Sequence, residues 1–305
     1  MRPGPAMPAR ACPIQMDQIY NAIFIGSIYA LFALGFTLVF SVLDILNLAH
    51  PALFTLGAFV ALFAMQQGVP AVLAVMVAFL VCGVAGVILD RIAFAPLRRR
   101  NAPPLSAMIS SIGVSLIIIR LIQLKYGPDL QAYPAGTLPA SVFSVGGLEL
   151  DTLRSAIIAL AIGLMLGLTY LVRRTRLGRE LRALAENPRA ARILGIDVER
   201  AIAATFFLSA GLGGVAGVLY GFATNSPFSQ MGLGFELKAF AVMVVGGMGS
   251  IPGAVLGAYI LSFGEIASLT FLPSELRDAF AYGLLFVVLV VRPRGILGQR
   301  AVDRV

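Results

Sequence analysis

Ionisable side chains inside long apolar runs are the first candidates for chemistry in this chain of 305 residues. Five of them lie in or beside such runs: Asp44, His50, Glu236, Lys238 and Glu265. An ionisable group at membrane depth is rare and by default marks a pathway or a binding site. His50 is the single histidine, and Cys12 and Cys82 are the two cysteines, so no metal-ligand spacing exists. We therefore expect neither metal-dependent catalysis nor a metal site.

The sequence also lacks a nucleotide-binding motif. The phosphate loop Gly-x4-Gly-Lys-Ser/Thr needs a lysine, and the two lysines, Lys125 and Lys238, lie outside any such pattern. Any coupling to ATP must therefore come from another subunit.

Two interruptions of the apolar pattern hold most of the remaining candidates. Gly, Pro, Asn or His breaks the segments 42–51 and 246–253, and irregular backbone at membrane depth is tolerated only beside protein or a water-filled cavity. The pathway candidates are Asn47, His50, Gly246, Gly247, Gly249, Ser250 and Glu265. Asn47 and His50 either satisfy freed backbone groups or contact a substrate. Glu236 and Lys238 are interpreted as the external boundary of a short span, and the sequence identifies no partner for Glu265.

The polar segment 173–200 predicts a short capped helix between two spans. Asn187 is a good N-cap, Pro188 suits the first helical position, and Gly195 suits a left-handed C-terminal cap. Ala190, Ile193 and Leu194 would share one face. Such a helix either docks on a partner protein or lies at the lipid interface.

Four stretches of sequence resemble the branched-chain amino acid permease family of ABC importers. They are Thr175 to Ile196 (Thr-Arg-x-Gly-Arg-Glu-Leu-Arg-Ala-x-Ala-Glu-Asn-Pro-x-Ala-Ala-x3-Gly-Ile), Ile28 to Leu38 followed by Asn47-Leu-Ala-His50, Lys238 to Ser250, and Arg292-Pro-Arg-Gly295. Ala190-Ala191 and Gly195 also resemble the Glu-Ala-Ala-x3-Gly loop of ABC importer permeases in general, with Arg189 in the place of its Glu. Pro51 departs from the branched-chain family, which usually has Gly after the His.

The resemblance implies a transport subunit that works with other chains. The expected partners are a second homologous permease, two cytoplasmic ATP-binding subunits and a periplasmic substrate-binding protein, so this chain holds no cofactor and ATP is bound by its partners. The implied ATPase-coupling helix comprises Arg182, Ala185, Glu186, Asn187, Pro188, Ala190, Ala191 and Gly195. The implied substrates are leucine, isoleucine and valine. A permease for urea or short amides, and an ion-coupled secondary transporter, remain as alternatives.

The elements that must position these residues are membrane-spanning helices. The chain is 59% hydrophobic and 12% charged, and several apolar runs approach the roughly 20 residues that a crossing requires. The predicted spans are 19–41, 52–66, 70–89, 106–124, 153–172, 202–223, 236–247, 253–268 and 279–291. We predict an all-α transmembrane bundle of eight or nine crossings in the inner membrane. Residues 16–305 form this domain, and 1–15 are an extension outside it, with Met16 as an alternative start.

The basic residues predict the orientation of the bundle. They gather in short loops and at the C-terminus, at Arg91, Arg98–Arg100, the arginines between Arg173 and Arg200, and Arg292, Arg294, Arg300 and Arg304. Clustering of this kind is typical of cytoplasmic loops rather than of nucleic-acid binding. The C-terminus is therefore expected in the cytoplasm, and the loop from Lys125 to Asp151 outside.

Self-similarity within the chain predicts an internal repeat. Asn47 to Phe59 can be aligned with Gly247 to Tyr259, which matches Leu56-Gly57-Ala58 with Leu256-Gly257-Ala258. Transporter folds are often built from such repeats, although chance similarity between apolar segments is the alternative. Glycines at every fourth position predict either close helix packing or a Gly-lined passage. They are Gly213, Gly217, Gly221, Gly249, Gly253 and Gly257.

Overall fold

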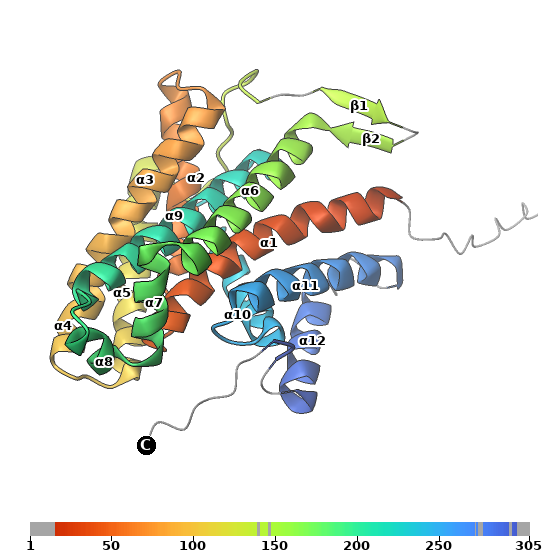
Figure 1. Cartoon of the computed structure of the whole chain (residues 1–305). Helices are drawn as coiled ribbons and strands as arrows, with labels where there is room; N and C mark the ends of the chain where they lie inside the picture. The colour runs from red at the N-terminus through yellow and green to blue at the C-terminus, as the bar shows by residue number, and fades with distance from the viewer. Residues whose placement is uncertain are drawn as a thin grey trace, which may run out of the picture.

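The computed structural model describes residues 16–138, 141–145, 148–271, 273, 277–292 and 295–297, and it forms a helical bundle (Figure 1). The elements are α1 (Met16–Leu43), α2 (His50–Gln66), α3 (Ala71–Leu89), the π-helix η1 (Asp90–Phe94), α4 (Ala95–Arg99), α5 (Pro104–Tyr126), β1 (Val142–Val145), β2 (Leu148–Asp151), α6 (Thr152–Arg174), α7 (Arg176–Glu186), α8 (Pro188–Ile193), α9 (Val198–Thr224), α10 (Leu233–Gly246), α11 (Ile251–Phe271) and α12 (Arg277–Val291).

Six helical segments are long and apolar enough to cross a membrane, in agreement with the predicted all-α bundle. They are Asp17–Leu43, Ala71–Arg99, Pro104–Tyr126, Thr152–Arg174, Val198–Thr224 and Ile251–Leu269. Two shorter apolar helical segments of the described chain, His50–Gln66 and Ala279–Val291, accompany them, and α10 is a further short helix. The chain is therefore a multi-pass membrane protein.

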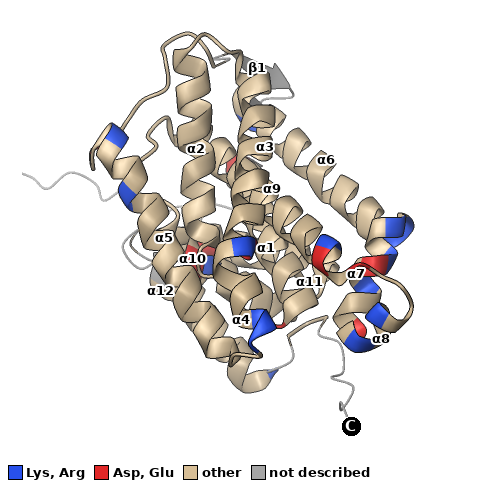
Figure 2. Ribbon diagram, turned by 90° about the vertical axis from the view of Figure 1, so that its left-hand side faces the viewer, with Lys and Arg blue, Asp and Glu red and all other residues tan. Residues whose placement is uncertain are grey.

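The bundle has two distinct ends. At one end, which we call the hairpin end, β1 and β2 pair antiparallel with Val142 opposite Asp151, and Tyr20 of α1 donates a hydrogen bond to the Asp151 carbonyl. At the other end, the α7–α8 end, the two short helices project beside the start of α9, and arginines gather on α4, α7 and α8 (Figures 1 and 2). α1 begins at the hairpin end and finishes at the α7–α8 end.

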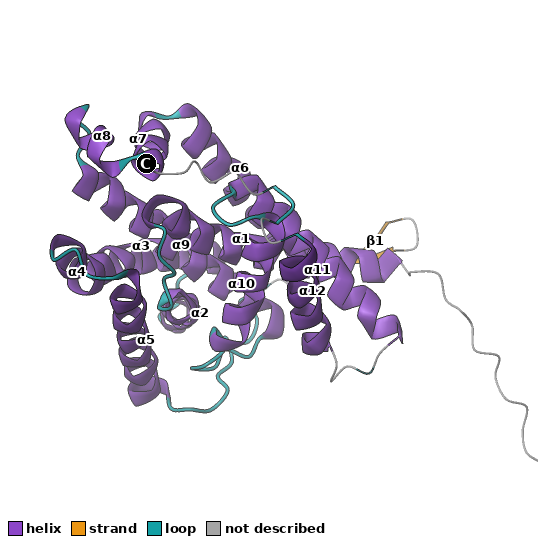
Figure 3. Ribbon diagram, turned by 90° about the horizontal axis from the view of Figure 1, so that it is seen from below, coloured by secondary structure: helices purple, strands orange, loops and turns teal. Residues whose placement is uncertain are grey.

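Helices α1 and α9 form the centre of the bundle. Both are largely buried, whereas α5 and α6 expose most of their apolar surface, as expected of helices that face lipid. Figure 3 shows α2 end-on, with α5, α9 and α10 around it. A Cβ added at Gly217 of α9 would lie 1.8 Å from the Phe54 carbonyl oxygen of α2. This glycine therefore permits direct backbone contact, as small residues do in membrane helix packing.

Both predicted interruptions are present. α1 ends at Leu43, where Asp44 takes a left-handed conformation (φ 56°), and α2 begins at His50. α10 ends at Gly246 and α11 begins at Ile251. The loop between the predicted spans 202–223 and 236–247 follows a path that was not predicted. After Asn225 (φ 47°), the chain turns back into the bundle, and the Gly232 amide donates to the Thr55 hydroxyl of α2 before α10 starts.

Candidate functional site

A buried charge cluster joins three helices through Tyr29, Lys238 and Glu265. The Lys238 ammonium of α10 lies 3.2 Å from Glu265 Oε1 of α11 and donates to the Tyr29 hydroxyl of α1 at 3.1 Å. Tyr29 in turn donates to Glu265 Oε2 at 3.0 Å. The Glu265 side chain is fully buried, and such a carboxylate is tolerated in a membrane only with a partner of opposite charge.

The interpretation of Lys238 as the external boundary of a span is wrong. Tyr29 lies nine residues below Tyr20 on α1, so the cluster sits about 13 Å inside the hairpin end at 1.5 Å per residue. Lys238 occupies the second turn of α10, and α10 begins inside the bundle because the preceding loop turns inward. Glu265 therefore has the partner that the sequence did not identify.

A cavity of about 550 Å³ lies on the hairpin side of this cluster. We call it the aromatic cavity, and its lining comes from α1, the end of α9, the 225–232 loop and the start of α10. Its lining residues include Phe24, Ile28, Tyr220, Phe228, Met231 and Phe235. Lys238 is the one charged side chain among the described residues that line it, while Glu265 lies behind Lys238, outside the lining.

An aromatic plug closes the bundle beneath the aromatic cavity. The Phe32 ring packs edge-on against Phe54 and Phe235, with centroids 5.1 and 6.0 Å apart, and tilted against His50 at 4.8 Å. A Cβ added at Gly35 or Gly213 would lie 2.8 or 2.6 Å from the His50 ring, so two glycines form the slot for the imidazole. His50 Nε2 lies 3.2 Å from the Phe32 carbonyl oxygen.

Asn47 and His50 occupy structural positions rather than a cavity wall. The Asn47 side-chain oxygen accepts from the Ala49 amide at 3.1 Å, which satisfies a backbone group freed by the interruption. Both side chains are buried, and neither lines the two cavities described in this section. The geometry favours the structural alternative for both residues.

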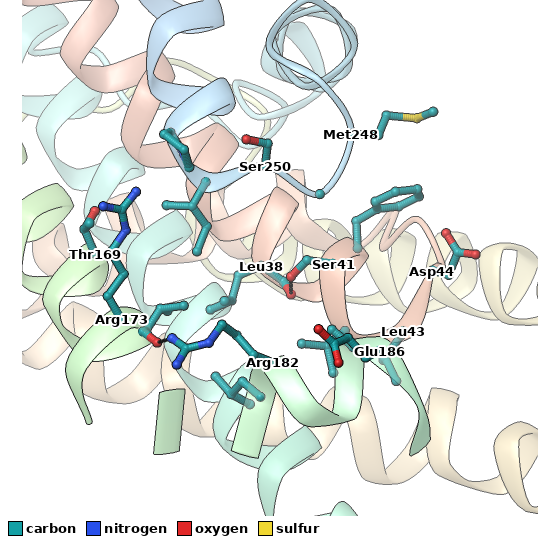
Figure 4. A pocket seen from close by; sticks show the side chains of 18 of the residues that line it. Leu38, Ser41, Leu43, Asp44, Thr169, Arg173, Arg182, Glu186, Met248 and Ser250 are labelled. Carbon is teal, nitrogen blue, oxygen red and sulfur yellow. Dashed lines mark hydrogen bonds between the residues drawn. The ribbon is translucent and has the colours of Figure 1, made fainter. Parts of the chain in front are cut away.

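A second cavity of about 530 Å³ lies at the α7–α8 end, and we call it the polar cavity (Figure 4). In Figure 4, Ser250 faces Leu38 and Ser41 of α1 across it. Four ionisable residues also line it: Asp44, Arg173, Arg182 and Glu186. α1 borders the aromatic cavity over residues 24–29 and the polar cavity over residues 38–44, with Phe32 and Phe36 between them.

Only some of the candidate residues in the second interruption line the polar cavity. Gly249 and Ser250 line it, and Gly249 is left-handed (φ 80°). Gly246 instead packs against the backbone of Gly253. Gly247 packs against the segment after α12, where the amides of Ile296 and Leu297 donate to the carbonyls of Val245 and Gly246. The pathway candidates are thus divided between a cavity wall and helix packing.

The capped helix lies outside the bundle as predicted, although it is shorter. α8 spans six residues, and the Asn187 side chain caps it by accepting from the amides of Arg189 and Ala190. At its other end, the Ile196 amide donates to the Ala191 carbonyl and the Gly195 amide to the Arg192 carbonyl, which is a Schellman motif with Gly195 left-handed (φ 82°). Both caps follow the sequence prediction.

The remaining coupling candidates gather beside α8. Arg182 of α7 donates to the Val172 carbonyl at the end of α6, and Ala185, Glu186 and Pro188 line the polar cavity. α7 was not predicted as a separate helix, and the Thr175 hydroxyl caps it by accepting from the Gly178 amide. Of the α8 segment, Ala190, Ile193 and Leu194 are exposed while Ala191 is buried against the bundle.

The chain is a multi-pass bundle with two cavities along one central helix and a pair of capped helices outside the membrane helices. This is the architecture of a membrane transport protein. The chain belongs to the family described as branched-chain amino acid transport system / permease component, whose profile matches residues 18–289.

Relatives across the whole chain agree with this family. The chain is 35% identical to the high-affinity branched-chain amino acid transport system permease protein LivH of Escherichia coli K12, over 95% of this chain and 97% of that protein. It is 34% identical to the corresponding permease protein BraD of Pseudomonas aeruginosa, over 95% and 98%. The fold resembles that of PsaBC from Streptococcus pneumoniae, solved in complex with Fab, with a TM-score of 0.51, 12% identity and coverage of 91% and 92%.

Proposed function

We propose that this chain is the membrane-spanning subunit of an ATP-driven importer of branched-chain amino acids in the cytoplasmic membrane. The family match over residues 18–289 carries the proposal. A second homologous permease, two ATP-binding subunits and an external substrate-binding protein complete the transporter. ATP is bound and hydrolysed by the partner subunits, so this chain supplies the pathway and the coupling surface.

The coupling surface is the exposed face of α8. Ile193 and Leu194 are 86% and 78% exposed, which is unusual for large apolar residues on a helix that lies outside the lipid-facing bundle. The caps at both ends hold this face in one conformation. We assign it to a groove of the ATP-binding subunit, and the arginines of α4, α7 and α8 support a cytoplasmic location for this end of the bundle.

The pathway follows α1 from the aromatic cavity to the polar cavity. In the structure the plug of Phe32, His50 and Phe54 separates the two, so passage requires the helices around α1 to rearrange. ATP binding drives this change only if α8 contacts the ATPase differently in the two states. The polar cavity touches α7 and the start of α8 directly, so movement of these helices reshapes its wall.

The coupling role is tested by Gly195→Val. A β-branched residue at φ 82° is strained and opens the C-terminal cap of α8, at a cost of about 1–2 kcal/mol or more. Gly68→Val is the matched control, because Gly68 has φ 83°, equally open surroundings, and a position in the α2–α3 turn at the hairpin end. Uptake per ATP hydrolysed should fall in Gly195→Val and persist in Gly68→Val. Equal coupling ratios in the two variants would contradict the assignment.

The substrate is tested by uptake of labelled leucine in a deletion strain and its parent. Loss of high-affinity leucine uptake on deletion, with unlabelled valine competing in the parent, supports branched-chain amino acids. Unlabelled urea serves as the separate competitor for the short-amide alternative. Unchanged leucine uptake in the deletion strain would refute the proposed substrate.

A further inference from the structure

Only one partner of the charge pair formed by Lys238 and Glu265 lines the aromatic cavity. The Lys238 side chain keeps 13% of its surface exposed and lines the cavity, whereas the Glu265 side chain is 0% exposed and lies outside the lining. The pair is neutral as a whole, which makes a lysine at this depth tolerable. The cavity nevertheless meets only the cationic side of the pair among its described lining residues.

Most of the remaining lining is apolar or aromatic, and Tyr29, Thr224 and Gln230 add polar groups to it. Phe24, Ile25 and Ile28 of α1 form one wall, and Phe228 and Met231 of the 225–232 loop belong to the lining as well. Tyr220 and Phe235 pack edge to face at 4.6 Å and add aromatic surface, to which a ligand ammonium can bind by a cation–π contact. A ligand that fits these surfaces has one carboxylate, one cationic group and an aliphatic side chain.

We propose that the aromatic cavity is a substrate-binding site of the permease itself, in which the Lys238 ammonium binds the carboxylate of an amino acid and the wall of α1 with Phe228 and Met231 binds its aliphatic side chain. This inference rests on the proposed function and adds to it the place and the chemistry of recognition. Lys238 is thus a binding residue, while Glu265 and Tyr29 are positioning residues that hold its ammonium at the cavity wall through contacts of 3.0–3.2 Å.

The site selects for a carboxylate. The carboxylate of an amino acid forms both a hydrogen bond and an ion pair with the ammonium, whereas the neutral oxygen of urea or an amide accepts the hydrogen bond without the attraction between opposite charges. The aliphatic wall discriminates weakly among leucine, isoleucine and valine, because one methylene changes binding by only about ten- to two-hundredfold. The site therefore distinguishes amino acids from neutral amides by charge, and apolar amino acids from one another by the fit of their side chains.

The test is photolabelling of membranes that contain the whole transporter, with a leucine analogue carrying a diazirine in its side chain. Labelled peptides are mapped by mass spectrometry. We expect the label on the cavity lining, at Ile28, Phe228 or Met231, with leucine and valine competing and leucinamide and urea failing to compete. Lys238→Met should lower this labelling at least about tenfold, since it removes a hydrogen bond to a charged group. Lys125→Met, which changes the other lysine of the chain, should leave it unchanged.

A second variant separates binding from folding. Lys238→Met with Glu265→Gln removes both charges together, which buried ion pairs often tolerate, so this protein should assemble and still lose the labelling. Labelling of Lys238→Met at the parental level, a label that maps outside the lining, or equal competition by leucinamide would overturn the inference. If the parent imports leucine but the label misses the cavity, the inference fails and the proposed function stands. If leucine uptake does not depend on this chain, the proposed function fails and the inference with it.

Discussion

Arg98→Met is expected to destabilise the bundle much more than removal of an exposed arginine does. Arg98 of α4 donates to Asp90 Oδ1 at 2.8 Å and to Glu199 Oε2 at 3.2 Å, and it thereby ties η1 to the start of α9. The Asp90 side chain is fully buried. Its second oxygen, Oδ2, has no hydrogen-bond partner among the described residues. Removing Arg98 therefore leaves a buried carboxylate without its cation.

The magnitude follows from burial. Breaking a buried ion pair by removing one partner costs about 3–5 kcal/mol, whereas an exposed pair contributes about 0–1 kcal/mol. Arg200→Met is the matched control, because Arg200 pairs with Asp197 at 2.9 Å while the two side chains are 87% and 50% exposed. Both variants remove one arginine of an ion pair near the same end of α9, so they differ mainly in the burial of the remaining carboxylate.

The assay uses the buried thiol of Cys82 in a Cys12→Ser background. Cys82 of α3 is fully buried, and its Sγ would lie 2.5 Å from a Cβ added at Gly214 of α9, so a maleimide reaches it only when α3 separates from α9. When opening is fast, the labelling rate follows the population of the open state. A loss of about 3–5 kcal/mol then accelerates labelling by about 140-fold to about 3,700-fold, at about one decade per 1.4 kcal/mol.

The double variant Asp90→Asn with Arg98→Met gives the decisive comparison. It has no unpaired buried charge, so its Cys82 labelling should return most of the way to the parental rate. Labelling of Arg98→Met within about fivefold of the parent, or a double variant as fast as the single one, would refute the reasoning from a buried carboxylate.

Three further changes test packing and capping. Gly217→Val places side-chain atoms where the Phe54 carbonyl lies and should lower the thermal unfolding midpoint by overpacking, at a cost of about 1–3 kcal/mol or more; an unchanged midpoint would mean that α2 moves away freely. Tyr133→Phe removes the 3.1 Å hydrogen bond to the Ala58 carbonyl, which should weaken the loop 127–138 by about 1 kcal/mol and quicken its proteolysis. Asn187→Ala removes the cap of α8, at about 0.5–2 kcal/mol, and should speed hydrogen exchange of the first α8 amides, with the α7 amides as the internal reference.

Local features of the chain were predictable from the sequence. The nine spans correspond to the observed helices α1, α2, α3, α5, α6, α9, α10, α11 and α12, because an apolar run long enough to cross lipid has no other stable conformation there. The two interruptions and both caps of α8 were also predicted. Asn187 and Gly195 act on backbone groups within a few residues of themselves, so their roles depend little on the rest of the fold.

Pairings between distant segments were not predictable. Lys238 and Glu265 are 27 residues apart and lie on antiparallel neighbours, and an inward turn after Asn225 sets the depth of Lys238. Asn225 and Pro227 mark a turn locally, but its direction into the bundle depends on a distant contact, because the hydroxyl that accepts from the Gly232 amide belongs to Thr55, 177 residues away. The same applies to the slot that Gly35 and Gly213 make for His50.

The sequence by itself thus determined that this chain is a membrane bundle, where its helices break, and which short helix lies outside it, because apolar length, caps and breakers act through neighbouring residues. The tertiary structure decided which polar groups meet. At membrane depth a charged group is stable only beside its counterpart, and the packing of α1, α10 and α11 selects that counterpart and places Lys238 rather than Glu265 at the cavity wall.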